Sequence, residues 1–177
     1  MTKAVLINGN TTKNSRLTGV HHYIEGYLKN FQVDVNSIYV HELPAEDLLF
    51  ANFSSEEIKQ ANKLVEEADV LVILTPIYKA SYTGVLKAYL DLLPQKAFVG
   101  KKIIPIAVGG SIAHLLALEY ALKPVLSVLG ATEILNSVYI VDKQIERLEN
   151  GRYQIEEEAE NRIKTELLNL LSINVYV

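Results

Sequence analysis

Hydrophobic positions along the chain fall either into short continuous runs or into longer stretches with helical spacing. The short runs are rich in Val, Ile and Leu and cover residues 3–8, 33–40, 69–75, 103–108 and 133–141. Such runs predict five strands. The stretches with helical spacing predict helices over residues 15–30, 54–68, 84–93, 111–129 and 156–172.

Strands that alternate with helices favour an α/β fold. The first, third and fourth runs are almost entirely apolar, which is typical of parallel strands covered by helices on both faces. We therefore predict a flavodoxin-like, doubly wound sheet of five parallel strands in the order 2-1-3-4-5, with helices on both faces. No repeat or linker divides the sequence, so one domain over residues 1–177 is expected.

Two segments lie outside this alternation. Residues 44–53 form a long connection after the second strand, which we expect to project beside the ligand-binding edge of the sheet. Near the end of the chain, Asn150 and Gly151 separate two short polar-apolar stretches. An Asn-Gly pair in this setting predicts a tight turn.

Composition and charge exclude several classes of protein. The 177 residues include 49% hydrophobic ones, 17 basic and 21 acidic ones, and the net charge is −4. A chain with this charge offers no basic surface for nucleic acid or an anionic membrane. The absence of cysteine excludes disulfides and thiolate chemistry. No leader-like segment and no apolar run of about 20 residues is seen, so we expect a cytoplasmic protein without a membrane span.

The segment NGNTTKNSR, residues 8–16, joins the first strand to the first helix. It lacks both the glycine spacing of a dinucleotide fingerprint and the Lys-Ser/Thr ending of a nucleoside triphosphate loop. Gly9 permits a tight turn, while Asn10, Thr11, Thr12 and Ser15 offer polar side chains. A helix that begins near Ser15 would also direct free backbone N–H groups at a terminal phosphate. The alternative is that Asn14 or Ser15 only caps the helix.

A second loop follows the third strand. Pro76 is expected to end that strand, and Tyr78 and Tyr82 would lie either against a planar ring or packed beneath the loop. Lys79 and Lys87 are expected in solvent, although Lys79 is near enough to the site to meet an anionic substrate.

A third loop follows the fourth strand and contains Gly109 and Gly110. Two glycines allow the backbone to approach a flat ligand closely, although a turn explains one of them equally well. His114 follows them without a partner nearby in the sequence, so a structural role is favoured over acid-base chemistry. The histidines at 21, 22 and 41 lack the spacing of metal ligands, and no metal site is expected.

Three stretches resemble a known family. TPIYKASYTGVLKAYLDLLP, VGGSIAHLLALEYALKPVLSVLGATEIL and PAEDLLFANF are similar to the NADPH-dependent FMN reductases of the flavodoxin-like superfamily, in particular the reductase components of two-component alkanesulfonate monooxygenases. The resemblance covers about residues 3–142. It implies FMN and NADPH as cofactors, with hydride passing from NADPH to FMN and the reduced flavin leaving for a partner monooxygenase.

The resemblance also implies which residues bind the flavin. The family's phosphate loop falls on Gly9 to Ser15. Thr12 stands at the position where the family has an arginine, so Lys13 or Arg16 would have to supply the missing positive charge. The loops beside the flavin ring match residues 76–78 and 109–110. The full set of predicted cofactor-binding residues is Gly9, Asn10, Thr11, Thr12, Ser15, Arg16, Pro76, Ile77, Tyr78, Lys79, Gly109, Gly110, Ser111 and His114.

No catalytic side chain is predicted, because the flavin itself carries the redox chemistry and the protein holds it against the nicotinamide. Two other functions stay open: an FMN-bound quinone, azo-dye or chromate reductase, and a flavodoxin-type electron carrier. The carrier class is usually more acidic than this chain, whose net charge is −4.

The predicted helix over residues 111–129 has few strongly polar residues and therefore no broad polar face. Either the 44–53 segment covers it or a second copy of the chain does; we favour a homodimer or homotetramer. The resemblance implies the same interface, with a π-type bulge at Tyr120. Pro124 predicts a further bend.

Overall fold

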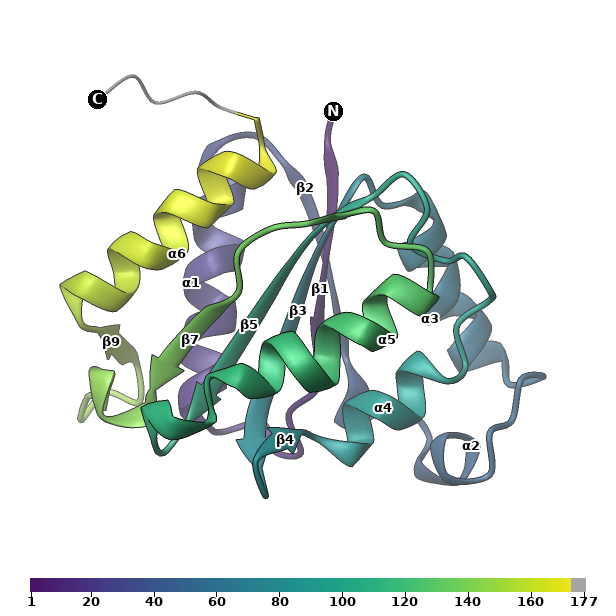
Figure 1. Cartoon of the computed structure of the whole chain (residues 1–177), viewed down its shortest axis with the longest axis horizontal. Coiled ribbons are helices and arrows are strands. Elements are labelled where there is room, and N and C mark those ends of the chain that lie inside the picture. The colour runs from purple at the N-terminus through teal and green to yellow at the C-terminus, as the bar shows by residue number, and fades with distance from the viewer. Residues whose placement is uncertain (173–177) are drawn as a thin grey trace.

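The computed structural model describes residues 1–172 and consists of a mainly parallel sheet between two layers of helices (Figure 1). The sheet follows the order β2-β1-β3-β5-β6. Its strands are β1 (Lys3–Asn8), β2 (Asp34–Tyr39), β3 (Val70–Tyr78), β5 (Lys102–Gly109) and β6 (Glu133–Ile134), with β7 (Val138–Val141) also paired to β5 and β4 (Ser81–Tyr82) paired to β3. The expected flavodoxin-like α/β architecture is confirmed, but the prediction of five strands is wrong because the sheet has seven.

Two local features account for the extra strands. The short β4 runs antiparallel to the end of β3, which continues beyond Pro76 to Tyr78. The predicted fifth strand is broken, since Ile103 pairs with Ile134 whereas Ile106 pairs with Val138, a slip of one residue. Pro105 lies between these pairs and has no N–H to donate to the neighbouring strand, which explains the break.

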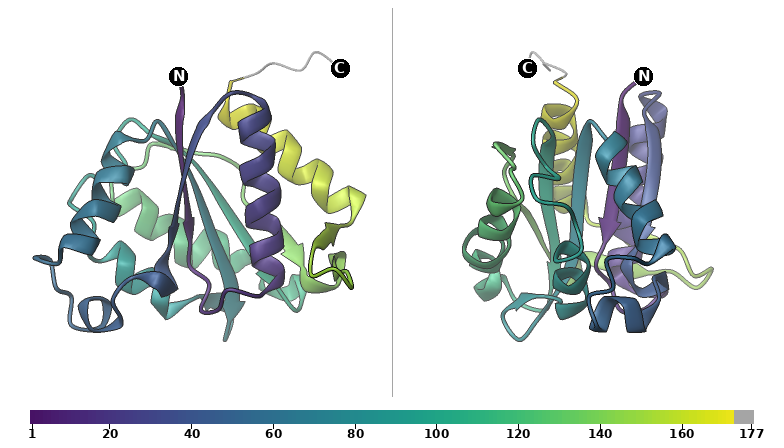
Figure 2. Two further views of the ribbon diagram at one scale, coloured as in Figure 1. Left: turned by 180° about the vertical axis from the view of Figure 1, so that it is seen from behind. Right: turned by 90° about the vertical axis from the view of Figure 1, so that its right-hand side faces the viewer.

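The two faces of the sheet bury different residues of the same strands. Along β1, Val5 and Ile7 belong to one core and Ala4 and Leu6 to the other. Figure 2 shows α1 (Arg16–Asn30) and α6 (Glu157–Leu170) side by side over one face. The other face is covered by α3 (Glu56–Glu67), α4 (Gly84–Leu90) and the segment that ends in α5 (Lys123–Val128).

The segment predicted as one helix over residues 111–129 is irregular. It begins with the 3₁₀ turn η2 (Ile112–His114), continues as the π-helix η3 (Leu118–Leu122) and ends as α5. The expected π-type bulge at Tyr120 is thus confirmed. Pro124 is the second residue after the bulge and offers no N–H, while the N–H of Lys123 donates to the carbonyl of Leu118, five residues earlier.

The remaining elements are short. The 3₁₀ turn η1 (Val40–Glu42) and α2 (Ala45–Leu49) form the predicted connection after β2. The turn η4 (Asp142–Gln144) leads into a hairpin of β8 (Ile145–Arg147) and β9 (Tyr153–Ile155). The tight turn predicted at Asn150 and Gly151 is confirmed, with Gly151 at φ 77°. No helix within residues 1–172 is long and apolar enough to cross a bilayer.

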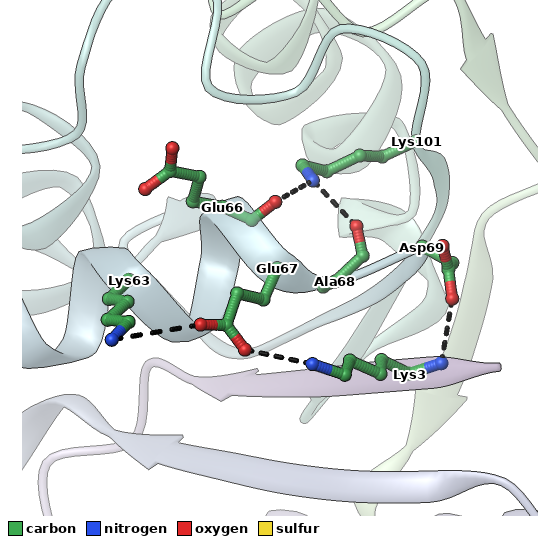
Figure 3. Close-up of polar contacts among 7 residues, drawn as sticks. All are labelled: Lys3, Lys63, Glu66, Glu67, Ala68, Asp69 and Lys101. Atoms are coloured by element: carbon green, nitrogen blue, oxygen red, sulfur yellow. Dashed lines mark hydrogen bonds and ion pairs between the residues drawn. The ribbon is translucent and has the colours of Figure 1, made fainter. Parts of the chain in front are cut away.

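The amino ends of the strands are held by a polar cluster at the end of α3 (Figure 3). The Lys101 ammonium donates to the carbonyl oxygens of Glu66 at 2.9 Å and Ala68 at 2.6 Å, which the helix leaves unpaired. Lys3 pairs with Glu67 at 2.9 Å. These contacts fix α3 to the sheet at the end opposite the predicted site.

Candidate active site

The three predicted loops meet at one edge of the sheet. In β1 Asn8 pairs with Leu74 of β3, and in β3 Pro76 pairs with Val108 of β5. Because these strands are parallel neighbours, their carboxyl ends and the loops that follow lie together. The convergence expected from the sequence is therefore confirmed.

The first loop is shaped by the side chain of Asn10, which is 1% exposed. Its amide oxygen accepts from the Thr11 N–H at 2.9 Å, and its amide nitrogen donates to the Thr12 carbonyl at 2.7 Å and to the Ser15 hydroxyl. Asn10 was predicted to offer its side chain to a ligand. The structure instead directs that side chain inward, where it holds the loop in shape.

A buried chain of hydrogen bonds anchors this loop to the sheet. The Asn10 N–H donates to the Asn8 side-chain oxygen at 3.0 Å, and the Asn8 amide nitrogen lies 3.2 Å from Nδ1 of His21. An amide nitrogen only donates, so Nδ1 accepts and Nε2–H of His21 donates to the Ser37 hydroxyl at 2.9 Å. Burial lowers the pKa of His21 to about 4, which keeps the ring neutral at pH 7.

The loop also contains backbone donors near the start of α1. Ser15 caps α1, its hydroxyl accepting from the Thr18 N–H at 3.3 Å. Within residues 1–172, however, the backbone N–H groups from Thr12 to Leu17 donate to no protein acceptor. A helix cap at Ser15 therefore leaves other donors of this amino-terminal turn available for an anion, because Ser15 uses only one of them.

The two cations near the loop have other partners. Arg16 Nε donates to the Ile145 carbonyl at 3.0 Å, which directs its side chain toward the hairpin. Lys13 forms an ion pair with Glu42 at 2.9 Å. Both side chains are therefore engaged with other groups in this structure.

The second loop is a hairpin whose turn is made by Lys79 and Ala80, at φ 49° and 63°. Both residues lie in the left-handed region, which costs about 1 kcal/mol or more for a residue with a side chain. Tyr78 is 52% exposed, and its hydroxyl lies 3.4 Å from the Thr11 hydroxyl, so the hairpin touches the first loop. Tyr82 is half-buried and packs against the core, so of its two predicted positions the one beneath the loop is confirmed.

The third loop separates the roles of its two glycines. A Cβ at Gly109 would overlap the Tyr139 hydroxyl and lie 3.2 Å from Cβ of Ile77, whereas a Cβ at Gly110 would meet open space. The Tyr139 hydroxyl donates to the Ser111 carbonyl at 2.7 Å and fixes this loop. Gly109 is thus required for packing, and Gly110 gives an exposed backbone surface beside the other loops.

The residues around the third loop are more exposed. Ser111 accepts from the Ala113 N–H at 3.2 Å and so caps the turn that ends at His114. His114 is exposed, and its imidazole ring makes no hydrogen bond within the described residues, although its backbone N–H donates to the Ser111 carbonyl at 3.3 Å. Within residues 1–172 no group of three or more His, Cys, Asp or Glu side chains could hold a metal ion.

Three residues important for the geometry were missed from the sequence. Asn8 anchors the first loop, Tyr139 the third, and the Thr83 hydroxyl joins the first two by donating to the Gly9 carbonyl at 2.6 Å. The Thr83 position carried a signal, since a threonine directly before a helix is a typical cap. Tyr139 carried none, because its partner is distant in the sequence.

Comparison with known proteins decides the family. The model of the NADPH-dependent FMN reductase family matches residues 2–146. This chain belongs to that family. An FMN reductase (NADPH) from Pseudomonas putida is 42% identical over 164 residues, which cover 92% of this chain and 83% of that protein. An FMN reductase (NADPH) from Escherichia coli K12 is 42% identical over 143 residues, or 81% and 75% of the two chains.

A solved structure extends this similarity to the three-dimensional fold. The apo form of the NADH:FMN oxidoreductase EMOB is 34% identical to this FMN reductase family member and superposes with a TM-score of 0.85, over 99% of this chain and 92% of that one. The loop edge described above thus belongs to a flavin reductase fold.

Proposed function

We propose that this protein is an FMN reductase that transfers hydride from NADPH to FMN and supplies the reduced flavin to a partner monooxygenase. Membership of the FMN reductase family supports the reaction. One structural observation supports the flavin site: the backbone N–H groups from Thr12 to Leu17, which have no protein acceptor within residues 1–172, belong to the same edge of the sheet as the exposed backbone of Gly110.

The residues present fit FMN. The unpaired N–H groups and the hydroxyls of Thr11 and Thr12 would hold its phosphate, which favours a helix amino terminus. Tyr78 and the backbone at Gly110 would border its ring, and Pro76 with Ile77 would form the floor. When bound, FMN supplies the redox chemistry: it accepts a hydride from NADPH and one proton from water, giving NADP⁺ and reduced FMN.

The remaining predicted residues have supporting positions in this proposal. Gly9 and Gly109 allow the close packing of the loops against Leu86 and Tyr139. Asn10 and Ser15 keep the phosphate loop in shape, and Ser111 and His114 lie at the open rim. Lys79, at the hairpin tip, would attract the anionic substrates. Arg16 stays a prediction, since its side chain points to Ile145 here.

The experiment that tests this function compares NADPH and NADH oxidation with FMN, FAD and riboflavin as acceptors. We expect NADPH oxidation to depend on added FMN. A colourless protein that needs added FMN would fit the release of reduced flavin, whereas a yellow protein that reduces quinones or azo dyes without added FMN would support the reductase alternative. No turnover with any flavin contradicts the proposal.

We also propose that the protein is a homodimer or homotetramer that packs through residues 111–129. Apolar side chains gather on this irregular segment with unusual exposure, among them Leu116 at 53% and Tyr120 at 78%. The substitution Tyr120→Arg should lower the mass measured by light scattering, whereas a wild-type monomer at micromolar concentration contradicts the proposed interface. A cytoplasmic location stays a prediction from the sequence.

A further inference from the structure

A pocket lies beside the phosphate loop, with Lys13 and Asn14 of that loop in its lining. It has a volume of about 630 Å³ and is enclosed by the first turns of α1, the end of β2 and the tip of the β8–β9 hairpin. Such a volume is within the range of small-molecule sites, roughly 300–1,000 Å³. Lys13 belongs to both the loop and the pocket, so a ligand here would be a close neighbour of the flavin phosphate.

Two tyrosine rings in the wall of this pocket are fixed by contacts with α1. Tyr39 stacks on the buried ring of His21 with 4.7 Å between centroids. Tyr153, from the hairpin, packs so closely on Gly19 that no Cβ would fit there. Both rings line the pocket. Fixed aromatic faces favour a flat, apolar ring as the ligand.

The polar groups of the pocket favour an anion. The only carboxylate among its lining residues is Glu42, and that group is already paired with Lys13. The Arg152 guanidinium has neither a hydrogen bond nor an ion pair with any residue in 1–172. Both ring nitrogens of His41 are buried at the wall without a partner. The pocket therefore has an uncompensated cation and unused hydrogen-bonding capacity.

We propose that this pocket binds an adenosine phosphate, with Arg152 at a phosphate group and the base against the tyrosine walls. A flat heteroaromatic base and a phosphate together match the fixed rings and the free guanidinium. This ligand has two sources: the 2′-phosphoadenosine half of NADPH, or a separate nucleotide. The first assignment rests on the proposed function, because FMN reduction consumes NADPH; the pocket itself does not.

The test uses adenosine 2′,5′-bisphosphate as the probe and the full chain without added flavin. Calorimetry should detect binding, and NMR should show shifted amide signals at Gly151, Arg152 and Tyr153. Arg152→Gln should weaken binding at least tenfold, because a charge-assisted contact to phosphate is lost. Arg147→Gln is the matched control: it removes an exposed arginine of the same hairpin outside the pocket and should leave the affinity unchanged.

Kinetics then separate the two sources. If the pocket holds the end of NADPH, the probe competes with NADPH, and Arg152→Gln raises the KM for NADPH but not the KM for NADH or FMN. Inhibition that is not competitive with NADPH assigns the site to a separate nucleotide.

The absence of binding at millimolar probe, or equal binding by wild type and Arg152→Gln, overturns the inference. Those results leave the proposed function intact if FMN is still reduced. Conversely, probe binding without flavin reduction keeps the nucleotide site and contradicts the proposed reaction.

Discussion

Because the ring of His21 is buried, the free energy of unfolding should decrease when the pH is lowered below about 6.5, before most carboxylates titrate. Its pKa is about 4 in the folded chain against the ordinary value of 6.5, mainly because burial disfavours the charged ring. The unfolded chain therefore binds one more proton below pH 6.5. Stability from this group is complete above that pH, declines as the pH falls toward 4, and then levels off.

The magnitude follows from the two pKa values. Each pH unit between them lowers the free energy of unfolding by about 1.4 kcal/mol. We therefore expect a loss of about 2 kcal/mol between pH 7.5 and pH 5 from His21 alone. For a domain whose total stability is typically about 5–15 kcal/mol, this change is easily measured.

Urea unfolding at several pH values between 7.5 and 5 tests the prediction. Other groups titrate as well, so the informative quantity is the difference between wild type and His21→Gln, a variant that cannot gain a proton. His21→Gln should be less stable at pH 7.5 but lose about 2 kcal/mol less on acidification. The matched control His22→Gln, at an exposed position of the same helix, should keep the wild-type slope. Equal slopes for wild type and His21→Gln, or an NMR titration of His21 near pH 6.5, would refute the reasoning.

Three further predictions concern the site and its supports. In flavin fluorescence titrations, the double variant Ser15→Ala with Thr12→Ala should bind FMN about tenfold more weakly and riboflavin as before, because only FMN carries a phosphate. Equal losses of affinity for both flavins would mean that the loop is only a helix cap. Gly109→Ala should cost about 1–3 kcal/mol in thermal unfolding through its overlap with Tyr139, against less than about 0.5 for Gly110→Ala; similar costs would contradict the packing account. Lys101→Met should cost about 1–3 kcal/mol in urea unfolding by leaving the carbonyls of Glu66 and Ala68, at the end of α3, unpaired. Lys63→Met, at an exposed position, should be nearly neutral.

The sequence predicted the parts of the fold that depend on local patterns. Continuous apolar runs located the parallel strands, and Asn150 with Gly151 located the hairpin turn. What it did not predict depends on partners distant in the chain. The break between β6 and β7 arises from Pro105 on the neighbouring strand, and the antiparallel β4 depends on two residues held at positive φ without glycine.

The same distinction applies to the candidate site. The loops and their glycines carry local signals, so their convergence could be predicted. The roles of Asn10 and Gly109 could not. The Asn10 amide bonds the Thr12 carbonyl and the Ser15 hydroxyl only once the loop is folded, and Gly109 is required by the Tyr139 hydroxyl, which is distant in the sequence. The polar side chain of Asn10 therefore suggested a contact with a ligand, whereas in the structure this side chain forms hydrogen bonds within its own loop.

The internal hydrogen bonds of Asn10 bear on the consequence of having Thr12 where the family pattern has an arginine. The family pattern holds the phosphate partly by a side chain, and Thr12 removes that charge. In this structure the loop is anchored by hydrogen bonds that run from Ser37 through His21 and Asn8 to Asn10, and within residues 1–172 its backbone N–H groups from Thr12 to Leu17 have no protein acceptor. A preorganised set of backbone donors loses little entropy on binding and needs no charged side chain. Phosphate binding should therefore depend more on the buried anchor than on any single side chain at the loop surface.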